Sequence, residues 1–167
     1  MSYTATVTRQ PLQTLLNLRG DANVGERFSD ALGIALPQQP NTVVSSANVD
    51  VLWLGPDEWL LKAPETDEQA LEKRLLAAVE EQHAAVTLVS DHYIVFRLSG
   101  EQAAVILQQA SSIDSHSSQL AMGQCVRCGF ARTRAIIQVI DDMSYDVFIE
   151  ATYTPYLEQW FAVAIGN

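Results

Sequence analysis

The ten residues from Leu52 to Leu61, LWLGPDEWLL, constrain the fold of this chain more than any other segment. Apolar residues stop abruptly at Gly55-Pro56-Asp57, a cluster of turn-forming residues, and resume immediately afterwards. This pattern predicts two strands joined by a tight reversal. Trp53 and Trp59 lie on either side of the turn, close enough to brace one hairpin, and we expect Trp53 to be mostly buried beside it.

Hydrophobic periodicity predicts an alternation of helices and strands along the rest of the chain. The segment Ala22–Leu32 is typical of a helix, because Asp21 can cap its first turn and Gly33 can end it. The predicted strands cover residues 12–18, 49–54, 58–63, 86–89, 92–98, 125–131, 135–140 and 145–150, and the predicted helices cover 22–32, 67–82, 101–109 and 155–164.

The order of these elements is β-α-β-β-α-β followed by β-α-β-β-β-α. It predicts an α+β fold made of two packed ferredoxin-like β-α-β-β halves. The expected boundary gives an N-terminal half at residues 1–88, with the Trp-Leu-Gly-Pro-Asp-Glu-Trp hairpin, and a C-terminal half at 89–167, together one compact unit. No repeat in the sequence is strong enough to prove that the halves are related.

Composition narrows the classes of function. With 48% apolar and 18% charged residues, the chain can bury a core and is not disordered. Ten basic against twenty acidic residues give a net charge of −10, which repels phosphate backbones and anionic lipid heads and argues against nucleic acid and membrane as partners. There is no apolar run of about 18 residues and no signal-peptide pattern, so a cytoplasmic location is expected.

Cys125 and Cys128 have CxxC spacing, which can indicate a metal or redox site. A structural zinc site needs four ligands, and the histidines are scattered at positions 83, 92 and 116. A redox pair is expected at the start of a helix, whereas this pair falls in a predicted strand. We therefore interpret both as ordinary packed cysteines and expect no metal site.

Other candidates for chemistry have structural interpretations that we favour. His83 ends a predicted helix, where an imidazolium stabilises the negative dipole end. Asp91 and His92 are neighbours along a strand and so point to opposite faces, which disfavours an acid–base pair. His116 lies in a serine-rich loop. The Gly-x-Ser-x-Gly, P-loop and Gly-x-Gly-x-x-Gly patterns are absent from the sequence, so no catalytic and no cofactor-binding residues are predicted.

One basic concentration stands out in this acidic chain. Arg127, Arg132 and Arg134 are either ordinary surface charge or a docking patch for an acidic partner surface, and the sequence leaves both open. Arginine and aromatic residues anchor protein interfaces. The candidate interface therefore comprises these arginines and three aromatic residues of the last helix, Tyr156, Trp160 and Phe161. An isolated chain is expected to self-associate through such a surface.

The sequence of the hairpin resembles the signature of the gamma subunit family of heterotetrameric sarcosine oxidase. Supporting stretches are Phe96-Arg97-Leu98-Ser99-Gly100, Tyr145-Asp146-Val147-Phe148-Ile149 and Tyr156-Leu157-x-x-Trp160-Phe161. The order of Ser99-Gly100, Asp114 and Gly123 resembles the folate-binding aminomethyltransferase-like fold. Gly100 and Gly123 also have a sufficient structural interpretation as points where the backbone turns. The signature residues are Trp53, Gly55, Pro56, Asp57, Trp59, Asp91, Gly100 and Gly123.

The resemblance implies a function that the residues alone do not. Such an enzyme oxidises the methyl group of sarcosine, yields glycine and hydrogen peroxide, and passes the one-carbon unit to tetrahydrofolate. FAD, FMN, NAD and tetrahydrofolate would be held by partner subunits, and the partners would be the alpha, beta and delta subunits. The gamma chain would be a non-catalytic, structural component.

Two departures from the family pattern are visible: the chain is somewhat shorter than typical members, and His92-Tyr93 follows the Asp where the family often has another pair. The first alternative function is a stand-alone folate-binding one-carbon-transfer protein, with Asp91 or Asp114 beside the folate ring. The second is an interaction protein unrelated to sarcosine.

Overall fold

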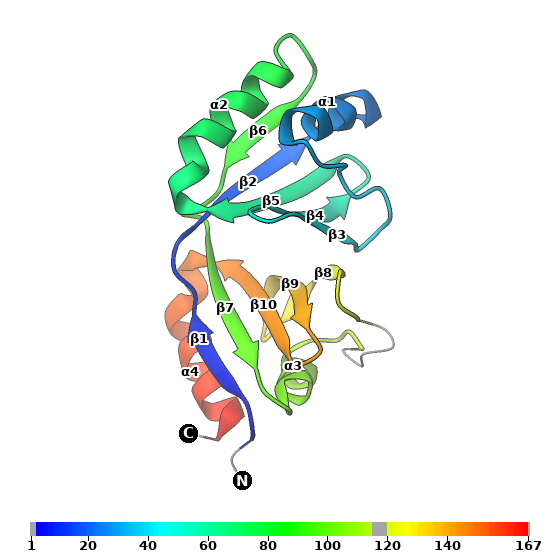
Figure 1. Ribbon diagram of the computed structural model, residues 1–167. Coiled ribbons are helices and arrows are strands. Elements are labelled where there is room, and N and C mark those ends of the chain that lie inside the picture. Colours follow the sequence, from blue (N-terminus) through cyan, green and yellow to red (C-terminus); the bar gives the residue numbers. More distant parts are fainter. Residues whose placement is uncertain (1–2, 115–119, 167) are drawn as a thin grey trace. The chain divides into compact units, whose positions relative to one another are not determined.

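A computed structural model describes residues 3–114 and 120–166 (Figure 1). His116 lies outside the described residues. The chain divides into two compact units, which we name by their place in the sequence and describe separately. The central unit is Leu12–Ser90, and the terminal unit combines the segment up to Pro11 with the chain from Asp91 onward. No helix of the described residues is long and apolar enough to cross a membrane.

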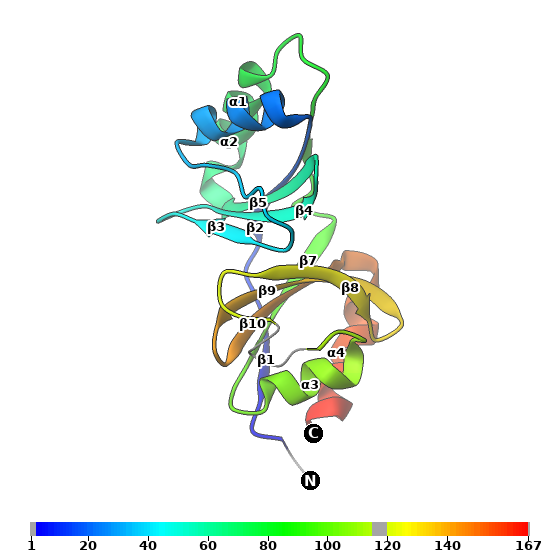
Figure 2. The ribbon, with the colours of Figure 1, turned by 90° about the vertical axis from the view of Figure 1, so that its right-hand side faces the viewer.

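The central unit is a five-stranded antiparallel sheet in the order β3-β4-β5-β2-β6, with two helices packed on one face (Figure 2). Leu16 and Leu18 of the sheet meet Phe28 and Leu75 of the helices in its core. The elements are β2 (Gln13–Arg19), α1 (Ala22–Leu32), β3 (Val43–Ser45), β4 (Asp50–Gly55), β5 (Glu58–Pro64), the 3-10 turn η1 (Glu65–Asp67), α2 (Glu68–Ala78) and β6 (Ala85–Leu88).

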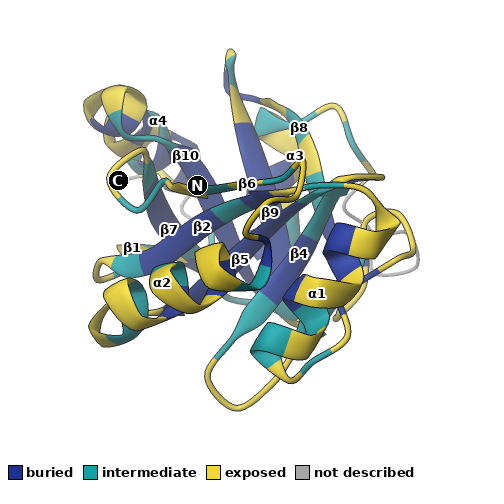
Figure 3. Ribbon diagram, turned by 90° about the horizontal axis from the view of Figure 1, so that it is seen from above, coloured by how far each residue is buried: buried dark blue, intermediate teal, exposed yellow. Residues whose placement is uncertain are grey.

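The terminal unit is a second five-stranded antiparallel sheet, in the order β1-β7-β10-β9-β8. Phe96 and Leu98 pack against Ile106 and Phe161 of its two helices, and Figure 3 shows buried strands beneath helices with exposed outer faces. The elements are β1 (Thr6–Arg9), β7 (Tyr93–Ser99), α3 (Ala103–Ala110), β8 (Cys125–Phe130), β9 (Thr133–Asp141), β10 (Ser144–Glu150), the 3-10 turn η2 (Ala151–Tyr153) and α4 (Thr154–Ile165).

The two units share one topology. Each has the strand order of a ferredoxin-like β-α-β-β-α-β unit, β6-β2-β5-β4 in the central unit and β1-β7-β10-β9 in the terminal unit, and each adds one further edge strand. From the hairpin to the following helix, each residue of the central unit corresponds to the residue 86 positions later in the terminal unit. Gly55 thus corresponds to Asp141, Trp59 to Tyr145, and Glu68 to Thr154. Both hairpins also carry an irregularity at the same place.

The boundary between the units differs from the one expected. Residues up to Pro11 were assigned to the N-terminal half, but they belong to the terminal unit because β1 pairs with β7. Each unit therefore receives its fourth strand from the segment just before the first strand of the other unit. Sequence patterns missed β1 and β3, since they have only four and three residues and none of these is fully buried, which leaves little hydrophobic alternation.

Local signals predicted some boundaries well. The helix Ala22–Leu32 is confirmed: the Asp21 side chain accepts a hydrogen bond from the backbone N–H of Val24, and Gly33 ends the helix at φ 73°. The helix expected to reach residue 82 instead ends at Ala78, and the following turn includes Glu81 at φ 65°.

Candidate functional site: the hairpin, the arginines and the last helix

The signature hairpin is formed by β4 and β5, with Trp53 and Trp59 directly opposite each other. Trp59 is the deeply buried member, at 1% exposure, and its indole N–H donates to the Pro37 carbonyl at 2.9 Å. Trp53, which we expected to be mostly buried, is half-buried at the edge of the same core. The Asp57 carbonyl accepts from the N–H of Gly20, so the turn also holds the end of β2.

Two signature glycines occupy backbone conformations that side chains rarely adopt. Gly100 has φ +121°, and a Cβ there would lie 2.5 Å from the carbonyl oxygen of Thr4. Gly123 has φ +82° in open space just before β8. At both positions the conformation of the backbone accounts for the glycine.

Among the described residues, the histidines and aspartates considered for chemistry lie at exposed positions. His83 is five residues beyond the last residue of α2, so the proposed role of capping that helix is wrong. Asp91 and His92 precede β7 in a turn, not in the strand, and the His92 ring makes an edge contact with Tyr93 at 4.6 Å between centroids. Asp114 is exposed as well.

Cys125 and Cys128 both lie on β8, and neither is part of a disulfide. Cys125 is buried, and burial raises the pKa of the Cys128 thiol to about 11. A thiol with so high a pKa is protonated at neutral pH and is a poor nucleophile. Within the described residues, His, Cys, Asp and Glu form no group of three that could hold a metal ion.

The three arginines are exposed on the β8–β9 hairpin. Arg127 and Arg134 line one shallow cavity of about 200 Å³ together with Glu150 and Tyr93. Arg132 lies at the hairpin turn, at φ 67°. The structure thus brings two of the three predicted arginines to one cavity and leaves the third at the tip of the turn.

The aromatic residues of α4 are divided between core and surface. Phe161 is 2% exposed and packs against Phe96 and Phe130, so its assignment to an interface is wrong. Phe161 follows Leu157 by four residues, so both side chains lie on the same face of α4. That face points into the core. Trp160 is half-buried, with its ring edge-on to Phe130, whereas Tyr156 is 41% exposed and donates its hydroxyl to the Ala131 carbonyl.

Sequence reasoning missed two charged pairs in the sheets. In the terminal unit, Arg97 donates two hydrogen bonds to Asp146, at 2.5 and 2.9 Å, and the Asp146 side chain is fully buried. In the central unit, Lys62 pairs with Asp50 at 2.8 Å. The available signal was a charged residue between apolar neighbours in each of two adjacent strands, because such residues are rarely buried without a partner.

The first comparison concerns the fold of the backbone. The backbone is similar to that of aminomethyltransferase T of the glycine cleavage system from Bartonella henselae, with a TM-score of 0.70, 16% identity, and coverage of 96% of this chain and 46% of that one. At this identity the likeness shows the fold alone.

Closer comparisons identify the family. The profile of the sarcosine oxidase, gamma subunit family matches residues 19–166, and this chain belongs to that family. It is 30% identical over 141 residues to the sarcosine oxidase subunit gamma of Corynebacterium sp. (strain P-1), covering 84% of this chain and 68% of the relative. It thus spans about two thirds of that curated relative's length.

The backbone also matches a chain of the heterotetrameric sarcosine oxidase from Corynebacterium sp. U-96, solved in complex with pyrrole 2-carboxylate. The TM-score is 0.91 and the identity 26%, and the match covers 96% of this chain and 83% of that one.

Proposed function

We propose that this chain is the gamma subunit of a heterotetrameric sarcosine oxidase and acts as a non-catalytic, structural component. The observation that carries the proposal is the match to a chain of such an oxidase at a TM-score of 0.91 over 96% of this chain. The family assignment over residues 19–166 supports it. The partners proposed are the alpha, beta and delta subunits of the same enzyme.

The structural, non-catalytic role is supported by what the reactive side chains do. The carboxylate of Asp146 is held by Arg97, and the ammonium of Lys62 is held by Asp50. Ser90 donates its hydroxyl to Glu68 at 2.6 Å and accepts from the N–H of Leu15. Each group makes bonds that hold neighbouring elements of one unit together.

In the proposed enzyme, FAD, FMN, NAD and tetrahydrofolate are held by the partner subunits. The complete assembly then demethylates sarcosine oxidatively and transfers the one-carbon unit to tetrahydrofolate. The gamma chain would contribute to assembly. Its loss should therefore lower the amount of intact complex and leave the activity of the complex that does assemble unchanged.

A stand-alone folate-binding protein is the second candidate, favoured by the backbone likeness to aminomethyltransferase T. Its proposed carboxylates, Asp91 and Asp114, are both exposed. Isothermal titration of the isolated chain with tetrahydrofolate separates the two functions. Saturable binding that is lost in Asp91→Asn or Asp114→Asn would favour the folate-binding protein.

Co-expression tests the first proposal directly. The chain, tagged, is produced with the proposed alpha, beta and delta subunits of the same enzyme, and the purified material is analysed by size exclusion and by sarcosine-dependent formation of hydrogen peroxide. We expect one flavin-containing complex that includes this chain, and no activity from the chain alone. An active, fully assembled enzyme that excludes this chain would contradict the proposal.

A further inference from the structure

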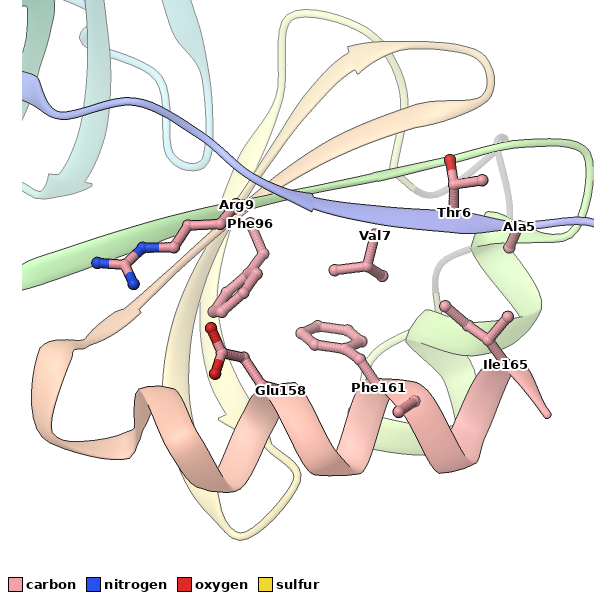
Figure 4. Close-up of a pocket in the computed structure, with 9 residues that line it drawn as sticks. Ala5, Thr6, Val7, Arg9, Phe96, Glu158, Phe161 and Ile165 are labelled. Carbon is pink, nitrogen blue, oxygen red and sulfur yellow. The ribbon is translucent and has the colours of Figure 1, made fainter. Parts of the chain in front are cut away.

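A cavity of about 380 Å³ lies within the terminal unit, between the edge strand β1 and the helix α4 (Figure 4). Most of the residues that line it are apolar, but polar atoms also face it, and it carries one residue of each charge, Arg9 and Glu158. Figure 4 shows Val7 and Phe161 pointing toward each other across it. Phe96, Ala162 and Ile165 also line the cavity.

The strand above this cavity has a free edge. Among residues 3–114 and 120–166, β1 is the terminal strand of its sheet and pairs on one side only, with β7. The N–H of Gln10 donates to the carbonyl of Val95, so Gln10, and with it Thr8 and Thr6, direct their backbone groups toward β7. Alternation along a strand then directs the N–H and C=O groups of Val7 and Arg9 outward. Outward groups on an edge strand are a template for another strand.

The equivalent position in the central unit is built differently. There the edge strand is β6, and α2 packs directly against it. The constant spacing of 86 places Leu76 where the terminal unit has Ala162. Leu76 is exposed on α2, whereas the smaller Ala162 lines the cavity beside β1.

We propose that β1 and this cavity form a docking site for an extended segment of a partner subunit, which adds to β1 as a sixth strand and places one apolar side chain in the cavity. The inference deepens the proposed function and rests on it. Strand addition supplies main-chain hydrogen bonds for affinity, and the pocket selects the side chain.

The occupant follows from two features of the site. The outward backbone groups of Val7 and Arg9 need an extended main chain, which an apolar small molecule lacks. A second copy of this chain would bring together two molecules of net charge −10, which repel each other. An apolar-centred strand of a different subunit satisfies both conditions.

Two substitutions close the site in different ways. Val7→Pro removes an outward N–H and no bond to β7, since proline is tolerated where the N–H of an edge strand faces solvent. Its matched control is Val86→Pro on the edge strand β6. The N–H of Val89 donates to the carbonyl of Leu15, toward β2, so alternation along the strand directs the N–H of Val86 outward. Ala162→Leu fills the cavity, and Gln159→Leu makes a similar change on an exposed position of α4 outside it.

Affinity for the alpha, beta and delta subunits is measured with the full chain by biolayer interferometry, after circular dichroism shows that each variant is folded. We expect Val7→Pro and Ala162→Leu to weaken binding by roughly tenfold or more each, about the effect of one net hydrogen bond or one anchor side chain. Both controls should bind like wild type. Unchanged affinity in Ala162→Leu would overturn the docking site, whatever Val7→Pro does to folding.

Hydrogen exchange provides a second readout in the assembled complex. The Val7 and Arg9 amides should exchange rapidly in the isolated chain and slowly in the complex, while the Thr8 amide is protected in both. Unchanged exchange at Val7 and Arg9 within an intact complex would overturn the inference and leave the proposed function standing. Failure of the wild-type chain to assemble at all would overturn the proposed function. Protection that grows with the concentration of the isolated chain would identify a second copy as occupant and also overturn the inference.

Discussion

The central and terminal units have the same strand order and the same helix-facing core positions, but they place charge differently. Leu71, Leu75 and Val79 of the central unit correspond to Leu157, Phe161 and Ile165 of the terminal unit, and all six are buried. On the opposite sheet face, the position of Leu60 is taken by Asp146 in the terminal unit. Packing against the helices is therefore the shared requirement of this fold, whereas the other sheet face tolerates exchange between apolar and charged residues.

The two units also differ in how deeply the carboxylate of each ion pair is buried. In the terminal unit, Arg97 and Asp146 join β7 and β10, near the middle of the sheet, and the carboxylate is fully buried. In the central unit, Asp50 and Lys62 join β4 and β5, which are also the second and third strands of their sheet, but Asp50 keeps a fifth of its side-chain surface exposed. The cost of breaking each pair should follow this burial, since an uncompensated buried charge is the expensive outcome.

The largest effect is expected at Trp59, the counterpart of Tyr145. Trp59→Ala removes a buried ring and its bond to Pro37, so we expect a loss of about 5 kcal/mol in the free energy of unfolding, measured by urea denaturation. Trp53→Ala, at the half-buried position opposite, should cost about 1–2 kcal/mol. Equal losses for the two tryptophans would mean that the hairpin, and not the core, carries the effect.

Breaking the two ion pairs tests the comparison of charge. Arg97→Met leaves the Asp146 carboxylate buried without its main partner and should cost about 3–4 kcal/mol. Lys62→Met leaves Asp50 with access to water and should cost about 1 kcal/mol. The measurement is again urea denaturation. A Lys62→Met variant less stable than Arg97→Met would show that burial does not rank the pairs.

Equivalent glycines end β2 and β7, and they should respond unequally to a methyl group. Gly100→Ala is strained by its φ of +121° and by backbone atoms of Thr4, so a loss of about 2–3 kcal/mol is expected. A Cβ at Gly20 would meet only side-chain atoms of Val24, at 2.2 Å. Gly20→Ala should therefore cost about 1–2 kcal/mol and show favourable coupling with Val24→Gly, which removes all of these atoms, in a double-mutant cycle. Absence of coupling would refute a side-chain origin.

The smallest effect concerns Cys128 and alkaline pH. Its thiol pKa is raised by burial from 9.0 to about 11, so the folded state retains a proton that the unfolded state has lost. The contribution of this group to stability is therefore fully present below pH 9 and is lost as pH rises to about 11. Denaturation midpoints of wild type and Cys128→Ser should converge over that window. Rapid alkylation of Cys128 by iodoacetamide at pH 8 in the folded protein would contradict the raised pKa.

The sequence predicted the elements whose determinants are local. Asp21 and Gly33 bound α1 by capping, and the turn residues after Leu54 fixed the hairpin. It could not predict that β1 pairs with β7, because a pairing between Val7 and Leu98 leaves no mark in either segment alone.

The candidate site was predicted less well than the fold. The arginines are on the surface as expected, but hydrophobic type alone did not separate the buried Phe161 from the exposed Tyr156 one turn earlier. The cavity beside β1 depends on Ala162 lying opposite an edge strand that was itself missed. A site built from two elements cannot be read from the sequence when one of them is a short, exposed strand.

The pairing of β1 with β7 has a consequence for synthesis on the ribosome. β1 emerges before β2, yet its partner follows only after the whole central unit has been translated. The central unit can close its own sheet as soon as β6 emerges, while β1 waits as an unpaired segment tethered to it. Pairing β1 with β7 closes the long loop of chain between them, and such non-local contacts form more slowly than local ones. Nascent chains halted once Ser90 has emerged from the ribosome should therefore carry a folded central unit with a protease-sensitive leading segment, and the terminal sheet should be the last to form.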